Sequence, residues 1–197
     1  MDDLLRGELL VMDSEDQRVR EELARDGSLF DGYHPRMEEV HRRNGERLKQ
    51  IIQEHGWPGQ SLVGEDGAFA AWRLLQHCIG DPPFLRAMLP VLWDAGRRGD
   101  IPLWHAAYLE DRIRMYEGRP QLYGSQFWTD ETGELQPYEI GLPEDLDRRR
   151  GEVGLEPFAE RLATMRKVSA DESKHAPKDY QEFMEKYEAW LKKTGWR

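Results

Sequence analysis

The chain has 197 residues, of which 39% are hydrophobic and 34% charged, as expected for a globular domain that dissolves in water. No segment approaches the roughly 20 apolar residues of a membrane span, and acids stand at the start where a signal peptide carries basic residues, so we expect a cytoplasmic protein without membrane contacts. A net charge of −10 disfavours binding to nucleic acids. The single Cys78 excludes an internal disulfide and a thiolate zinc site.

Apolar residues at helical spacing, together with capping residues, predict five helices in the first 117 residues. The glycine-rich stretch 56–67 also contains Trp57 and Val63, which indicates a packed loop before the third helix. Asp81 stands directly before Pro82, and Asp100 stands two residues before Pro102, as at a helix start. The expected helices cover 2–26, 35–55, 66–79, 82–95 and 102–117.

The second half contains the only convincing β-structure of the sequence, a hairpin near 123–140 around a polar loop at 130–133. The sequence therefore predicts a mainly α fold: a single-domain helical bundle with one small hairpin and a C-terminal amphipathic helix. Two further helices are predicted at 143–151 and 155–168. The predicted organisation is a domain over 1–168, a linker at 169–177 and a C-terminal segment at 178–197.

The last predicted helix, 178–194, has an aromatic stripe at spacings of three and four residues. Packing of this stripe on its own domain is favoured. Docking to a protein partner through 178–194 stays open as an alternative.

Neither a metal nor a nucleotide cofactor is expected. Glu38 and His41 have the i, i+3 spacing of a di-iron bundle, but the second copy that such a site needs is missing, as is an HExxH motif. The glycine-rich segments lack the spacing of a phosphate loop. Cys78 follows His77 directly, so on a helix the two side chains diverge, and Cys78 is expected in the core.

Polar side chains at helix ends and before the hairpin form the candidate site. Each of them alone is more often structural, but as a group they favour a ligand pocket. They are Gln76 and His77 in the last turn of the third helix, Tyr108, Asp111 and Arg112 on the fifth, and Gln121, Tyr123 and Gln126 in the segment that follows.

Five segments together resemble a bacterial family of unknown function over roughly residues 5–160: DQRVR, HGWPGQSLVGEDG, AAWRLLQHCIGDPPF, AAYLEDRIRMYEGRPQLYGSQF and DRRRGEVGL. The resemblance implies a set of recurring polar positions and names no reaction. Among these positions are Asp16, Gln17, Gln76, His77, Asp81, Asp111, Arg112, Gln121, Tyr123 and Gln126.

The residue types present favour a metal-independent acid–base enzyme of hydrolase, lyase or isomerase type, acting on a small polar molecule or peptide. His77 is the expected acid or base, Asp111 its orienting carboxylate, and Tyr123 a donor to a developing oxyanion. The expected substrate-binding residues are Gln76, Tyr108, Arg112, Gln121 and Gln126. A non-catalytic binding or protein-interaction domain is the main alternative, and a structural protein without a ligand is a third.

Overall fold

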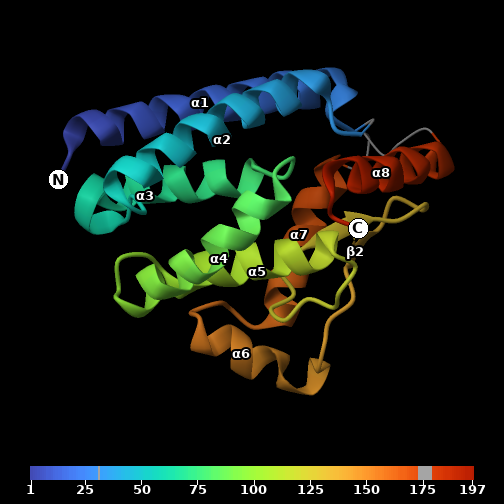
Figure 1. Ribbon diagram of the computed structural model, residues 1–197. Helices are drawn as coiled ribbons and strands as arrows, with labels where there is room; N and C mark the ends of the chain where they lie inside the picture. Colours follow the sequence, from blue (N-terminus) through green and yellow to red (C-terminus); the bar gives the residue numbers. More distant parts are fainter. Residues whose placement is uncertain (31, 173–178) are drawn as a thin grey trace. The chain divides into compact units, whose positions relative to one another are not determined.

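A computed structural model describes residues 1–30, 32–172 and 179–197. This part of the chain has eight α-helices and one two-stranded antiparallel sheet, which confirms the predicted mainly α fold with a small hairpin (Figure 1). It groups into two compact units, Met1–Ile101 and Pro102–Arg197. None of the described helices is long and apolar enough to cross a bilayer.

The first unit consists of four helices and one 3₁₀ turn. These are α1 (Asp3–Asp26), the turn at Ser28–Phe30, α2 (Pro35–His55), α3 (Gln60–His77) and α4 (Pro82–Arg97). Helices α1, α2 and α3 pack against one another (Figure 1).

The second unit combines the other four helices with the hairpin. Its elements are α5 (Leu103–Tyr116), β1 (Phe127–Thr129), β2 (Leu135–Pro137), the 3₁₀ turn at Pro143–Asp145, α6 (Leu146–Glu152), α7 (Phe158–Glu172) and α8 (Tyr180–Thr194). Residues 173–177 of the predicted linker lie outside the described part of the chain.

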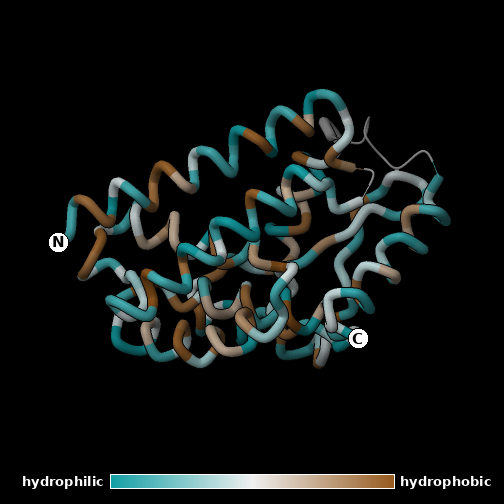
Figure 2. Tube along the Cα trace, turned by 45° about the horizontal axis from the view of Figure 1, so that its top comes forward, coloured by the Kyte–Doolittle hydropathy of each residue, from teal (hydrophilic) through white to brown (hydrophobic). Residues whose placement is uncertain are grey.

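Two buried aspartates interrupt the apolar face of α1. The helix begins where the Asp2 side chain accepts a hydrogen bond from the backbone N–H of Leu5 at 3.0 Å, and it ends at Gly27 in the left-handed conformation. Its apolar positions recur between hydrophilic stretches (Figure 2). Because a buried carboxylate needs partners, Asp13 and Asp16 must be satisfied by side chains of neighbouring helices.

The loop before α3 is packed as predicted, with Trp57 and Val63 buried, but the helix begins earlier than the sequence indicated. A first turn starts at Gln60, and the helix is broken at Gly64, which has φ 74°. Only glycine adopts this conformation without strain. The expected start at Asp66 corresponds to the regular helix that follows the break.

Asp81 and Asp100 both cap helices, but Asp100 does not cap the helix that the sequence assigned to it. The Asp81 carboxylate accepts from the N–H of Phe84 at the start of α4, as predicted. Asp100 instead accepts from the N–H of Ser61 at 2.7 Å, in the first turn of α3. Helix α5 begins after Pro102 without a side-chain cap.

The aromatic stripe of α8 packs within the second unit, as the sequence favoured. The ring centroids of Tyr116 and Trp190 lie 5.5 Å apart, and those of Trp128 and Tyr180 lie 6.3 Å apart. Leu191 is fully buried. The stripe thus packs, partly buried, against other elements of its own unit.

The contact between Gly59 and Asp100 generates a stability prediction. A Cβ atom at Gly59 overlaps the Asp100 carboxylate, which must then leave the N–H of Ser61. We expect Gly59→Ala to lower the free energy of unfolding by about 1–2 kcal/mol, the cost of a lost cap. Urea denaturation measures this. Gly80→Ala, which places its Cβ in open space, is the control, and an equal effect of the two substitutions contradicts the prediction.

Candidate functional site

A carboxylate from α1 lies between two imidazoles in the core of the first unit. The side chain of Asp16 is 1% exposed. Its Oδ1 lies 2.8 Å from Nδ1 of His77, at the end of α3, and its Oδ2 lies 3.3 Å from Nε2 of His41, on α2. The imidazole rings have centroids 4.9 Å apart. Three helices that pack together therefore bring three titratable groups to one point.

A tyrosine extends this cluster on the side of His41. The hydroxyl of Tyr33, which precedes α2, lies 2.7 Å from Nδ1 of His41. The chain of contacts thus runs from Tyr33 through His41 and Asp16 to His77. His77 is the more open end, since 22% of its side chain is exposed while His41 is buried.

The charge of Asp16 determines where the protons of this network lie. Burial by itself raises the pKa of Asp16, but its interactions with His41 and His77 outweigh burial and hold this pKa well below its ordinary value. An ionised carboxylate only accepts, so Nδ1 of His77 and Nε2 of His41 carry the protons that face it. Nδ1 of neutral His41 then accepts from the Tyr33 hydroxyl.

A cleft of about 210 Å³ adjoins the network in the first unit. Tyr33 and His41 both line it, so the network has access to a small ligand. The cleft carries charges of both signs, which suits a polar molecule. Its other lining residues are Glu38, Arg42, Gly45, Glu46, Lys49, Cys78, Gly80, Asp81 and Phe84.

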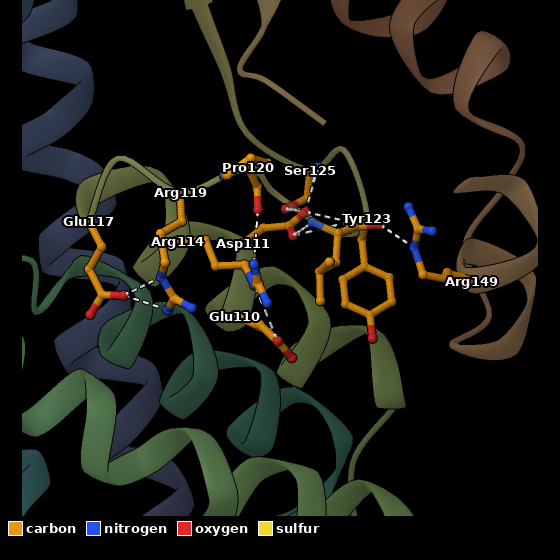
Figure 3. Close-up of polar contacts among 10 residues, drawn as sticks. Glu110, Asp111, Arg114, Glu117, Arg119, Pro120, Tyr123, Ser125 and Arg149 are labelled. Atoms are coloured by element: carbon orange, nitrogen blue, oxygen red, sulfur yellow. Dashed lines mark hydrogen bonds and ion pairs between the residues drawn. The ribbon is translucent and has the colours of Figure 1, made fainter. Parts of the chain in front are cut away.

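Asp111, predicted to orient His77, organises the loop of its own unit (Figure 3). Its buried carboxylate accepts from the backbone N–H groups of Leu122 at 2.6 Å, Tyr123 at 3.1 Å and Ser125 at 3.0 Å, and from the Ser125 hydroxyl. Burial raises the pKa of Asp111, and these hydrogen bonds oppose the rise. The carboxylate is occupied in holding residues 122–125.

Gln121 and Gln126 are buried in the same loop. The amide nitrogen of Gln121 donates to the carbonyls of Gln126 and Tyr138, and its oxygen accepts from the N–H of Gln126. The Gln126 amide donates to the hydroxyl of Ser125. These bonds tie the loop to the residue after β2.

Two neighbouring arginines of α6 close the loop from another side. Arg149 donates to the carbonyls of Leu122 and Gly141, and Arg150, which is fully buried, donates to the carbonyl of Tyr123. Figure 3 shows Arg149 reaching this loop. The DRRRGEVGL segment therefore has a structural explanation within the second unit.

The other predicted residues are divided between the units. Gln76 is buried beside His77 in the first. In the second, burial raises the pKa of Tyr108, raises that of Tyr123 to about 12, and lowers that of Arg112. The pairing of His77 with Asp111 stays a prediction, because the two residues belong to different units.

The sequence-based site missed Tyr33, Asp16 and His41 as members of one cluster. The available signal was the pair of acids at Asp13 and Asp16, in line with the apolar positions of α1. A helix that buries such a stripe also buries the acids.

Comparison with known proteins places the chain in a family. Residues 3–170 match DUF6624, a family of unknown function. The chain belongs to this family. The match ends before α8, and no curated protein and no solved structure matches the chain.

The role of Asp111 generates a second stability prediction. An amide at this position turns one acceptor oxygen into an NH₂ group that faces N–H donors. We expect Asp111→Asn to lower the free energy of unfolding by about 3 kcal/mol. Chemical denaturation measures the loss. Glu110→Gln, which alters the partly exposed pair with Arg114, is the control and should cost about 1 kcal/mol or less. A small effect of Asp111→Asn on the free energy of unfolding would contradict the structural role of this carboxylate.

The lowered pKa of Asp16 predicts a pH dependence. Its folded pKa lies below the unfolded value of about 3.9, so the ionised carboxylate stabilises the fold above this value, and this contribution is lost as the pH falls from about 5 towards the folded pKa. We expect Asp16→Asn to weaken the acid dependence of the free energy of unfolding, measured by urea denaturation between about pH 7 and pH 3. Asp94→Asn, in an exposed pair with Arg97 whose attraction is screened by solvent, should change this slope much less. A wild-type slope for Asp16→Asn contradicts the prediction.

Proposed function

We propose that this member of the DUF6624 family is an enzyme that performs acid–base chemistry on a small polar molecule bound in the cleft of the first unit. One observation carries the proposal: a buried carboxylate lies 3.3 Å from an imidazole that lines a cleft and contacts a tyrosine hydroxyl. A carboxylate, an imidazole and a hydroxyl in series form the arrangement that activates a hydroxyl in many hydrolases.

The proton steps follow from the donors and acceptors. Nδ1 of His41 takes the proton of the Tyr33 hydroxyl, and the imidazolium so formed is stabilised by Asp16 at 3.3 Å from Nε2. The tyrosinate oxygen then takes a proton from the substrate, and the reverse sequence returns a proton to the product. Proton transfer by positioned side chains contributes about 10²- to 10⁴-fold to a rate.

His77 keeps a place in this reaction centre, with Asp16 in the role that the sequence assigned to Asp111. Its hydrogen bond to Oδ1 fixes the orientation of the carboxylate, whose Oδ2 faces His41. His77 therefore acts as a positioning residue. Arg42 and Lys49 line the cleft within ion pairs to Glu46 and Asp81, and the exchange of such a partner for a substrate carboxylate would anchor an anionic group.

The test begins with a thermal-shift screen of amino acids, hydroxy acids, amides and sugar phosphates against the full chain. A ligand at about a hundred times its Kd should add about 2.7 kcal/mol of stability. Stabilising compounds are then followed for conversion by NMR. We expect Tyr33→Phe and His41→Gln each to lower kcat by about 10²- to 10⁴-fold.

The control is His55→Gln, at the partly exposed end of the same helix as His41. It should keep the wild-type kcat and the wild-type thermal shift. Conversion at the wild-type rate by folded Tyr33→Phe and His41→Gln would refute the proposal. Loss of activity in Asp111→Asn at unchanged stability would instead favour the pairing of His77 with Asp111.

A further inference from the structure

Three side chains of the first unit offer ligand atoms that meet at one point. These are Oδ1 or Oδ2 of Asp16, Nε2 of His41 and Nδ1 of His77, all within 4.8 Å of one another. They come from three different helices that pack together, so their positions are set by the core and not by a loop. Two imidazoles and one carboxylate form a donor set found in mononuclear metal enzymes.

The distances between these atoms suit a metal ion. With bonds of about 2.0–2.1 Å, neighbouring ligands of a tetrahedral ion lie about 3.3 Å apart, and those of an octahedral ion about 2.9 Å. The separations are 3.3 Å between Asp16 and His41 and 2.8 Å between Asp16 and His77. The two separations involve different oxygens of Asp16, and the ligand atoms of all three residues lie within 4.8 Å of one another.

The charge balance of the α1 face leaves one negative charge for a cation. Asp13 and Asp16 are both buried on this face, and the guanidinium of Arg73, from α3, pairs with Asp13. In the described part of the chain, the ion-pair partners of Asp16 are both histidines. A buried carboxylate is stable when it is paired or when it binds a metal.

Two buried atoms of the cluster face each other without a hydrogen bond. Oδ2 of Asp16 and Nε2 of His41 lie 3.3 Å apart but are not aligned for a bond, and neither has another hydrogen-bond partner among the described residues. Unsatisfied buried polar atoms are uncommon and call for an explanation. An ion that both atoms contact supplies one.

Tyr33 has the position of a residue that supports a metal ligand. Metal-bound histidines use their second ring nitrogen in a hydrogen bond that fixes the ring. The hydroxyl of Tyr33 lies 2.7 Å from the second nitrogen of His41. When Nε2 of His41 binds the ion, Nδ1 carries the proton and donates it to the tyrosine oxygen.

We infer that Asp16, His41 and His77 form a binding site for one divalent transition-metal ion, with Zn²⁺ or Fe²⁺ preferred over Mg²⁺ and Ca²⁺. Imidazole nitrogens suit the former ions, whereas the latter prefer sites built only from oxygen. Three protein ligands leave at least one coordination position for water or a ligand. The ion takes the place of the protons that face Asp16 and would polarise a molecule bound beside it.

This inference is an alternative to the proposed acid–base steps, because Nδ1 of His41 carries a proton when Nε2 binds the ion and then cannot take the proton of the Tyr33 hydroxyl. Metal binding is measurable without a substrate, so it is tested separately. The chain is freed of metal with a chelator and titrated with Zn²⁺ by calorimetry and with Co²⁺ by visible absorption. We expect one ion per chain and the absorption bands of Co²⁺ bound to nitrogen and oxygen. Asp16→Asn and His77→Gln should weaken binding by more than about 100-fold, and Tyr33→Phe by about 10-fold.

His55→Gln is the matched control and should bind Zn²⁺ like the wild type. Circular dichroism establishes whether each variant is folded. If Asp16→Asn is unfolded, the test rests on His77→Gln. Absence of stoichiometric binding by the wild type would overturn the inference, and so would wild-type affinity in a folded His77→Gln. Activity of the chelator-treated chain would leave the acid–base proposal standing, so the two proposals fail separately.

Discussion

The organisation of the first unit depends on the burial of one ionised carboxylate on the inner face of α1. Asp16 occupies a position that helical periodicity assigns to an apolar side chain, and it is nevertheless almost completely excluded from water. Such a group costs several kcal/mol unless its neighbours compensate for the lost hydration. His41 and His77 provide this compensation. Helices α2 and α3 must therefore pack against α1 so that both imidazoles reach the Asp16 carboxylate.

Asp111 shows that a buried carboxylate can be satisfied in a different way. Its partners are three backbone N–H groups and one hydroxyl, none of which changes its charge near neutral pH. The partners of Asp16 are imidazoles, whose two ring nitrogens can each donate or accept a hydrogen bond. The same residue type thus serves as a fixed anchor in the second unit and as part of a network of side chains that can move protons in the first. The chemistry of the partners, and not burial itself, makes Asp16 the better candidate for a reaction centre.

The sequence predicted the helices well because their ends are set by local signals. Gly56 ends α2, and Asp81 caps α4, and both effects act within a few residues. The break at Gly64 and the cap from Asp100 were not predictable in this way, since they depend on contacts across the fold. The same limit applies to the site. His77 was identified from its place at a helix end, whereas its partner Asp16 lies 61 residues earlier on a different helix.

The sequence of α1 nevertheless indicated that acidic side chains are buried in the first unit. Between the buried residues Leu9 and Val19, the inner face of α1 continues through Asp13 and Asp16. Arg73 neutralises the first of these acids, and the second therefore requires a cation of another kind. A proton on an imidazole and a divalent metal ion both meet this requirement with the atoms already in place. The choice between them changes the reactivity of the cleft, because a proton gives the site an acid and a base, whereas a metal ion gives it a Lewis acid.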